Sequence, residues 1–88
     1  MQIVKNASAG TMESSDAYVE IEPADTLQVQ LESVVGQQFG QQIEAAVKQV
    51  LQENGVEKAT VRVIDRGALE CVIRARVETA IYRGREEV

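Results

Sequence analysis

The spacing of the apolar residues is the feature that most restricts how this chain can fold. Apolar and polar side chains alternate over residues 17–22, 27–32 and 59–63, which is the period of a strand that buries one face. Over residues 35–51 and 69–81 the apolar side chains recur every three or four positions, which is typical of an amphipathic helix. The sequence therefore predicts the order strand, strand, helix, strand, helix.

Turn and capping signals separate these elements. Residues 23–26, with the sequence Pro-Ala-Asp-Thr, connect the first two strands, which we expect to form an antiparallel hairpin. Ser33 is the expected N-cap of the first helix, and Asn54 with Gly55 is its expected C-terminal stop. Residues 65–67 are expected to turn the chain into the second helix.

The helices must bury their apolar faces against the sheet, which implies layers. Residues 27–64 form a strand–helix–strand unit, for which we expect a right-handed crossover. Ile3 and Val4 suggest a further short strand. The predicted fold is an α+β two-layer sandwich, with a three- or four-stranded, mostly antiparallel sheet and two helices on one face. We expect residues 1–88 to form a single domain, because no repeat or linker divides the chain.

Composition argues against several classes of function. The formal net charge of −5 makes nucleic acid an unexpected partner. The chain has one cysteine and no histidine, so it cannot form an internal disulfide or a Ser–His triad, and it lacks the Cys and His ligands of a usual zinc site. No stretch approaches the roughly 20 apolar residues of a membrane span, so we expect a cytoplasmic protein with no metal and no membrane contact. Residues 1–57 carry nine acidic and two basic side chains, which fits either solvated faces or an acidic docking surface.

Two segments carry a more specific signal. Residues 9–16 (AGTMESSD) combine Gly, Ser, Thr and Asp without apolar periodicity, which predicts an exposed segment presenting two adjacent hydroxyls. Residues 65–76 (DRGALECVIRAR) form the second segment. Together they resemble the acyl carrier protein of citrate lyase, also called its gamma subunit, with Met12 for a usual Leu and Arg66 for a usual Lys. The resemblance extends over nearly the whole chain.

The resemblance implies a carrier role. In that family the first segment holds a covalent phosphopantetheine-type prosthetic group, 2'-(5''-phosphoribosyl)-3'-dephospho-coenzyme A, whose thiol carries acetyl or citryl as a thioester. It implies Ser14 as the attachment residue, through a phosphodiester, which makes the chain a phosphoprotein. It also implies that the citrate lyase alpha and beta subunits cleave citrate to acetate and oxaloacetate, as in citrate fermentation. This chain would be a non-catalytic subunit, and a separate transferase would attach the arm.

The residues around the serine pair support that division of labour. A serine hydroxyl is a weak nucleophile without a general base, and the chain has no histidine to act as one. Glu13 and Asp16 would repel an incoming triphosphate rather than activate the oxygen, so we expect them to help partners recognise the segment. If the segment is extended, Ser14 and Ser15 point to opposite faces, and only one is presented to the transferase.

Other residues of the two segments have simpler expected roles. We expect Cys71 to pack as a small hydrophobic residue, since the acyl-bearing thiol belongs to the arm. Arg74 and Arg76 are either solvated or paired at the surface, or they hold the phosphates of the arm. Gly10 and Gly67 are expected to be turn glycines rather than a phosphate cradle.

Two alternatives stand beside the citrate lyase interpretation. The first is the acyl carrier subunit of malonate decarboxylase, which uses a similar arm, although the sequences GTMESSD and GALEC favour citrate lyase. The second is a small α+β interaction module without a covalent group, in which Ser14 is ordinary or is phosphorylated.

Overall fold

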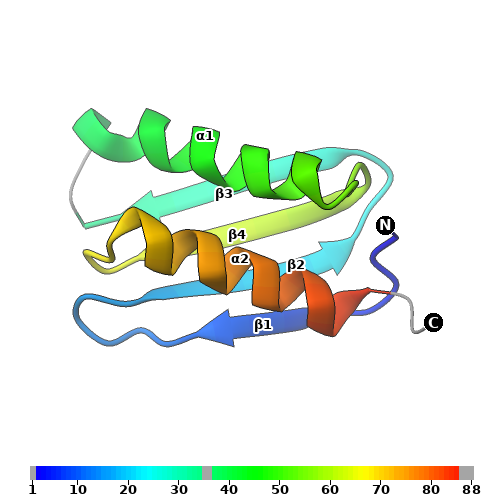
Figure 1. Ribbon diagram of the computed structural model, residues 1–88, viewed down its shortest axis with the longest axis horizontal. Coiled ribbons are helices and arrows are strands. Elements are labelled where there is room, and N and C mark those ends of the chain that lie inside the picture. The colour runs from blue at the N-terminus through cyan, green and yellow to red at the C-terminus, as the bar shows by residue number, and fades with distance from the viewer. Residues whose placement is uncertain (1, 35–36, 86–88) are drawn as a thin grey trace.

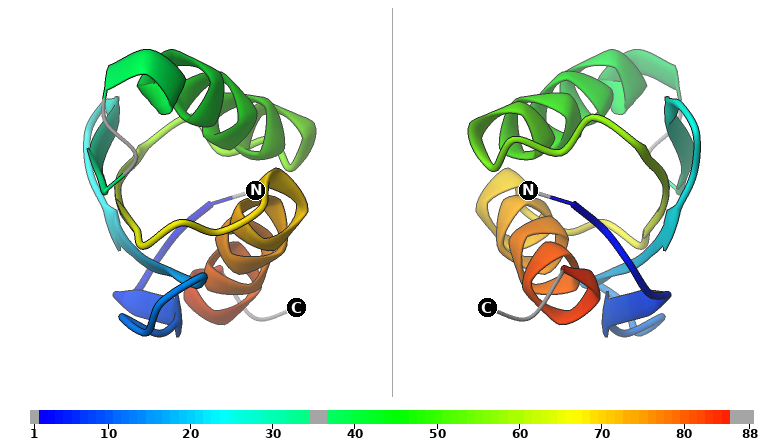
Figure 2. Two further views of the ribbon diagram at one scale, coloured as in Figure 1. Left: turned by 90° about the vertical axis from the view of Figure 1, so that its left-hand side faces the viewer. Right: turned by 90° about the vertical axis from the view of Figure 1, so that its right-hand side faces the viewer.

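The computed structural model describes residues 2–34 and 37–85, which form two layers (Figure 1). One layer is a sheet of four strands: β1 (Ala7–Gly10), β2 (Ala17–Pro23), β3 (Leu27–Ser33) and β4 (Ala59–Asp65). The other layer consists of the helices α1 (Gln37–Glu53) and α2 (Glu70–Gly84). Both helices cover the same face of the sheet (Figure 2), which confirms the predicted α+β sandwich.

The strand order β1-β2-β4-β3 differs from the predicted hairpin. β2 pairs antiparallel with β1 and with β4, whereas β3 pairs in parallel with β4. The expected antiparallel pairing of residues 17–22 with 27–32 is therefore wrong, because β4 lies between the two strands. Alternation determines which face a side chain occupies, but it does not identify the neighbouring strand. The strand–helix–strand unit formed by β3, α1 and β4 is present, as predicted.

Helix α1 lies on the sheet through an apolar stripe. Its buried side chains are Ile43, Ala46, Val47, Val50 and Leu51. The helix begins at Gln37, so Ser33 is not its N-cap. Ser33 is instead the last residue of β3, and Val35, the first residue of the predicted stripe, lies outside the described residues.

The C-terminal end of α1 follows the predicted signal. Gly55 has a φ of 68°, a left-handed conformation that glycine adopts without strain. Its N–H donates to the Gln52 carbonyl at 3.0 Å, and the Val56 N–H donates to the Leu51 carbonyl at 2.9 Å. These two bonds are the Schellman pattern that satisfies the last carbonyls of a helix.

Helix α2 packs beside the edge strand β1 and the N-terminal residues. It buries Ile73, Val77, Ala80, Ile81 and Gly84. The backbone N–H of Val4 donates to the Gly84 carbonyl at 2.9 Å, and Ile3 forms an isolated bridge with Arg85. The short strand suggested at Ile3 and Val4 is therefore only this bridge, and the edge strand of the sheet begins later, at Ala7.

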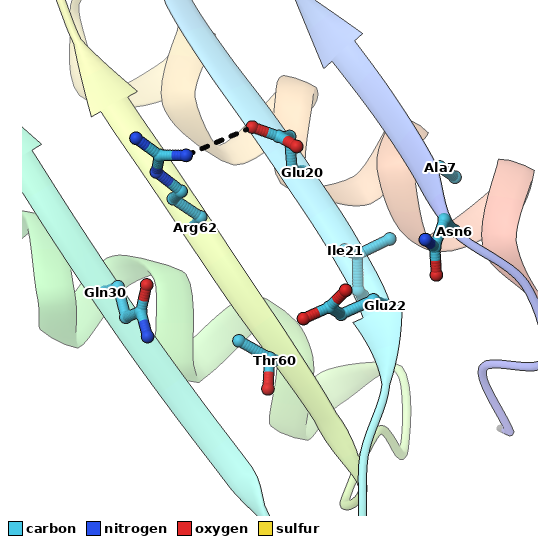
Figure 3. A pocket seen from close by; sticks show the side chains of 8 residues that line it. All are labelled: Asn6, Ala7, Glu20, Ile21, Glu22, Gln30, Thr60 and Arg62. Atoms are coloured by element: carbon cyan, nitrogen blue, oxygen red, sulfur yellow. Dashed lines mark ion pairs between the residues drawn. The ribbon is translucent and has the colours of Figure 1, made fainter.

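The face of the sheet away from the helices is polar. Figure 3 shows the side chains of Glu20, Glu22, Gln30, Thr60 and Arg62 over this face, around a shallow hollow. Arg62 Nη1 lies 3.7 Å from Glu20 Oε1, and both side chains are about half exposed. One apolar and one solvated face is usual for a sheet with antiparallel pairing. Neither helix of the described chain has the length and apolar character needed to cross a membrane.

Candidate functional site

The first signature segment connects β1 to β2. Ala9 and Gly10 belong to β1, and Ala9 is buried, so the connecting loop comprises residues 11–16. Ser14 and Ser15 are both exposed in this loop, as predicted. The loop lies at the end of the molecule where both helices begin (Figure 1).

A β-turn presents the two serines. The Asp16 N–H donates to the Glu13 carbonyl at 3.2 Å, which makes Ser14 and Ser15 the central residues of the turn. Ser15 has a φ of 67°, and among the described non-glycine residues it alone has a positive φ. The segment is therefore a turn, because a positive φ at the third position is the type II arrangement, and the extended conformation that would place the two serines on opposite faces is not present. The backbone conformation distinguishes the two hydroxyls.

The second signature segment lies directly beside this turn. The Ser15 N–H donates to the Arg66 carbonyl, and the Arg66 N–H donates to the Asp16 carbonyl, both at 2.9 Å. Ala17 and Asp65 are the last pair in the register of β2 with β4, and these bonds continue that pairing into the turn. The two segments, which are far apart in the sequence, therefore form one site.

Asp16 connects the loop to helix α2. Its Oδ2 accepts a hydrogen bond of 2.7 Å from Thr11 Oγ1, and its Oδ1 accepts one of 2.7 Å from the Ala17 N–H. Arg76 adds two bonds of 3.1 Å, from Nε to Oδ1 and from Nη2 to Oδ2. The bonds from Thr11, Ala17 and Arg76, in that order of effect, lower the pKa of Asp16 from 3.8 to about 2.

This pairing changes the electrostatic expectation for the loop. Asp16 is ionised at neutral pH, but Arg76 compensates its charge. Of the two flanking acids, only Glu13 is therefore left to repel an incoming triphosphate. Arg76 is thus paired within the site, and its side chain remains 40% exposed. Arg74 is paired elsewhere, because its Nη2 donates to Gln49 Oε1 at 2.7 Å and its Nε lies 3.3 Å from Glu70 Oε2.

Asp65 orders the connection between β4 and α2. Its side chain is 1% exposed, and its Oδ1 accepts bonds from the N–H groups of Gly67 and Ala68, at 3.0 and 2.8 Å. Gly67 has a φ of 93°, which agrees with its predicted role as a turn glycine. Gly10 also has a φ of 93°, although it is the last residue of β1.

The structure corrects the expected packing of Cys71. The residue is exposed because it lies on the opposite side of α2 from the buried stripe, two residues or about 200° from Ile73. Leu69, the residue before the helix, is also 72% exposed. The period of the pattern predicted the helix correctly, but Leu69 and Val72 do not belong to its buried stripe.

A hollow of about 250 Å³ lies between the first turns of the two helices. Its lining residues are Phe39, Gln42, Ile43, Asp65, Gly67, Ala68, Glu70 and Ile73. No group of three His, Cys, Asp or Glu side chains in residues 2–34 and 37–85 is arranged to hold a metal ion.

The sequence and the fold are similar to those of known carriers. A family model described as malonate decarboxylase delta subunit (MdcD) matches residues 4–84. A citrate lyase acyl carrier protein of Haemophilus influenzae is 51% identical over 87 residues, covering 99% of this chain and 92% of that protein. The chain belongs to the citrate lyase acyl carrier protein family. The family member of Escherichia fergusonii is 51% identical over 89 residues, with the same coverage of the two chains.

The fold of this carrier family also occurs in a solved structure. A chain in the crystal structure of a Pseudomonas malonate decarboxylase hetero-tetramer in complex with malonate has a TM-score of 0.72. The match covers 92% of this chain and 84% of that one, at 21% sequence identity, and so concerns the fold alone. The two citrate lyase carriers are 51% identical to this chain over nearly its full length, and this similarity favours the citrate lyase family over the malonate decarboxylase family.

The site is compatible with the covalently attached prosthetic group that an acyl carrier family implies. The Ser14 side chain is exposed at the tip of a turn, so a group can be attached without displacing the core. Arg66 is also exposed, and its backbone is bonded to this turn, so a cationic residue is adjacent to the segment that would hold the group.

Proposed function

We propose that this chain is the acyl carrier subunit of a citrate lyase and that Ser14 is the residue to which its arm is attached. The arm is a phosphoribosyl-dephospho-coenzyme A joined through a phosphodiester to Ser14 Oγ, and its thiol carries acetyl or citryl as a thioester. The observation that carries this proposal is the exposed turn at Ser14, which belongs to the first segment that characterises the family and is hydrogen-bonded to the second.

The chain presents the hydroxyl and does not activate it. A serine hydroxyl needs a general base to attack phosphorus at neutral pH. Asp16 is engaged by Arg76, Thr11 and the backbone, and the other flanking acid, Glu13, is exposed to solvent. We infer that a transferase supplies the base. Ser14 Oγ then bonds to phosphorus of a triphosphate precursor, the bond to the diphosphate leaving group breaks, and the serine proton passes to the transferase.

Once loaded, the subunit acts by tethering its acyl group. A tethered thioester meets its catalysts at an effective concentration set by the arm and does not diffuse away between steps. The partners that exchange the acyl group and cleave citrate are the alpha and beta subunits, so this chain has no catalytic step of its own. We place this work in the cytoplasm, which suits a chain whose one cysteine, Cys71, is a free thiol.

The test is the mass of the intact chain after co-expression with the transferase and the precursor synthase. Wild type should gain the mass of the arm, and Ser14→Ala should stay at the unmodified mass while folded. The matched variant is Ser15→Gly, because glycine suits the φ of 67° at that position and removes only the hydroxyl. It should still gain the arm.

Two results would overturn the assignment. Modification of Ser14→Ala to the wild-type extent would show that the wrong hydroxyl was chosen. A bare or merely phosphorylated chain, isolated from active complex of the native host, would contradict the carrier function itself and favour an interaction module.

A further inference from the structure

We propose that the Asp16–Arg76 ion pair is a positioning device that makes Ser14, and not Ser15, the acceptor of the arm. This inference rests on the function proposed above and concerns how the chain presents its hydroxyl. The pair spans two elements, since Asp16 ends the β1–β2 loop and Arg76 lies in α2.

The geometry of the pair fixes the loop to a rigid element. Arg76 Nε and Nη2 donate to the two oxygens of Asp16 at 3.1 Å, a fork that determines both the position and the orientation of the carboxylate. The next residue of the helix, Val77, is fully buried against the sheet. Arg76 is therefore held by the core at its backbone and by Asp16 at its tip.

The Arg76 side chain passes close to Gly10 on its way to the loop. A Cβ at Gly10 would collide with the Ala17 carbonyl oxygen, and it would also lie 3.1 Å from Arg76 Cδ, tighter than most such contacts. The missing side chain lets the arginine stem pass over the end of β1 and reach the loop. Gly10 thus serves the contact between helix and loop, in addition to having a φ of 93°.

Asp16 transmits this position to both ends of the loop. Its carboxylate binds Thr11 at the start of the loop and the Ala17 N–H at its end, at 2.7 Å each. Thr11 Oγ1 in turn accepts the Glu13 N–H at 3.2 Å. The residues that flank the serine pair are therefore joined through one carboxylate.

The consequence for the serines is a defined turn. Ser15 is kept at its positive φ by its N–H bond to Arg66 and by the Asp16 to Glu13 bond that closes the turn. Ser14 takes the preceding corner position. Without the pair, the turn can relax to conformations of lower strain at Ser15, and the two adjacent hydroxyls then compete for the same phosphorus.

The pair also sets the charge that the transferase substrate meets. Arg76 compensates Asp16, so an incoming polyphosphate faces one uncompensated carboxylate of the loop, that of Glu13. Loss of Arg76 exposes a second negative charge beside Ser14, whereas Asp16→Asn removes the charge but keeps the shape. The two variants therefore separate geometry from electrostatics.

The pair is only partly exposed, at 40% for the Arg76 side chain and 16% for that of Asp16, so it also contributes to stability. The identity of the modified serine separates the two roles, because a loss of stability alone would not transfer the arm to Ser15. The matched control is Arg62→Gln, which removes the exposed pair between Arg62 and Glu20 on the face of the sheet away from the helices (Figure 3).

The experiment measures arm attachment by purified transferase to Asp16→Asn, Arg76→Gln, Arg76→Lys and Arg62→Gln. Three quantities are recorded: kcat and KM for the carrier, the modified serine by peptide mass spectrometry, and amide exchange of Ser15 and Asp16 in the unmodified protein. We expect kcat/KM to fall about 10- to 100-fold for Asp16→Asn and Arg76→Gln, the range that a misplaced reacting group costs. Part of the arm should appear on Ser15, and both amides should exchange faster.

The other variants sharpen the result. Arg76→Gln should raise KM more than Asp16→Asn does, because it leaves the acid uncompensated. Arg76→Lys keeps the positive charge but cannot make the two-pronged hydrogen bond to Asp16. Compared with Arg76→Gln, it should therefore bring KM closer to the wild-type value than it brings the selectivity for Ser14. Arg62→Gln should match wild type within about twofold in every quantity, with thermal midpoints confirming that all variants are folded.

Exclusive modification of Ser14 at the wild-type rate in both Asp16→Asn and Arg76→Gln would overturn the positioning role and leave the proposed function intact. If wild type itself gained no arm, the proposed function would fail instead. Amide exchange would then decide separately whether the pair holds the turn, since unchanged exchange in the two variants would refute that too.

Discussion

Ser33 Oγ donates a hydrogen bond of 2.9 Å to Asp65 Oδ2 and thereby joins the last residues of the parallel strands β3 and β4. The other oxygen of Asp65 accepts the N–H groups of Gly67 and Ala68, which shape the turn into α2. A single carboxylate, 1% exposed, therefore closes the sheet at the end where both signature segments lie.

Replacing Asp65 should destabilise the protein more than any exposed acid. Asp65→Ala removes the carboxylate that accepts from the Ser33 hydroxyl and from two backbone N–H groups, and a hydrogen bond to a charged group contributes about 1.5–3 kcal/mol. We expect a loss of about 2–4 kcal/mol in the free energy of unfolding, measured by urea denaturation. Asp65→Asn keeps an acceptor oxygen and should lose less. A larger loss for Asn than for Ala would contradict this account.

The glycines at positions 10 and 67 provide a matched test of backbone strain. Both have a φ of 93°, but a Cβ at Gly10 would meet the Ala17 carbonyl oxygen, whereas one at Gly67 would meet no described atom within 4 Å. Gly67→Ala should cost about 1–2 kcal/mol, the usual penalty for a left-handed alanine. Gly10→Ala should cost more than about 3 kcal/mol or prevent folding. Equal losses in urea denaturation would refute the clash.

Periodicity predicted the helices and the layered fold because it reports which face of each element is buried. It could not predict the partner of each strand. The alternation in β2 and β3 is compatible with a hairpin, and only the parallel pairing of β3 with β4 shows that they are separated. A loop of the length found after Pro23 is compatible with either arrangement, so local sequence did not decide between them.

The site was predictable as two segments but not as a contact. The exposure of Ser14 followed from the turn-forming residues around it. The pairing of Asp16 with Arg76 did not, because it joins residues 60 positions apart and depends on the crossing of α2 over β1. The exposure of Cys71 was missed for a different reason, because a free cysteine was expected to pack as a hydrophobic residue although its position lies opposite the buried side of α2.

The exposure of Cys71 predicts that its thiol is accessible and dispensable. Cys71→Ala should change the free energy of unfolding by less than about 0.5 kcal/mol, as for most surface substitutions. In the folded wild type, a thiol reagent should label the residue without prior unfolding. Acetylation and citrate cleavage by the complex should persist in Cys71→Ala. A folded, arm-bearing Cys71→Ala protein that could not be acetylated would instead indicate a thiol relay.

The Asp16 carboxylate predicts a specific dependence of stability on acid. Its pKa is about 2 in the folded chain against an ordinary value of 3.8, first because of the Thr11 hydrogen bond and then because of the bonds from Ala17 and Arg76. A group whose pKa is lowered by folding stabilises the protein above its unfolded pKa, and loses that contribution as the pH falls through its folded pKa. The contribution of Asp16 should therefore be complete above about pH 5 and disappear as the pH falls from about 4 to about 2.

The thermal midpoints of wild type and Asp16→Asn, measured across this range, test the prediction directly. Their difference should be constant above about pH 5 and should shrink toward zero near pH 2, where the protonated acid resembles the amide. Thr11→Val removes the largest cause of the shift, so it should raise the pKa of Asp16, followed by NMR titration of the carboxyl carbon, more than Arg76→Gln does. An Asp16 that titrated near 3.8 in the folded wild type would show that neither Thr11 nor Arg76 holds the carboxylate in solution.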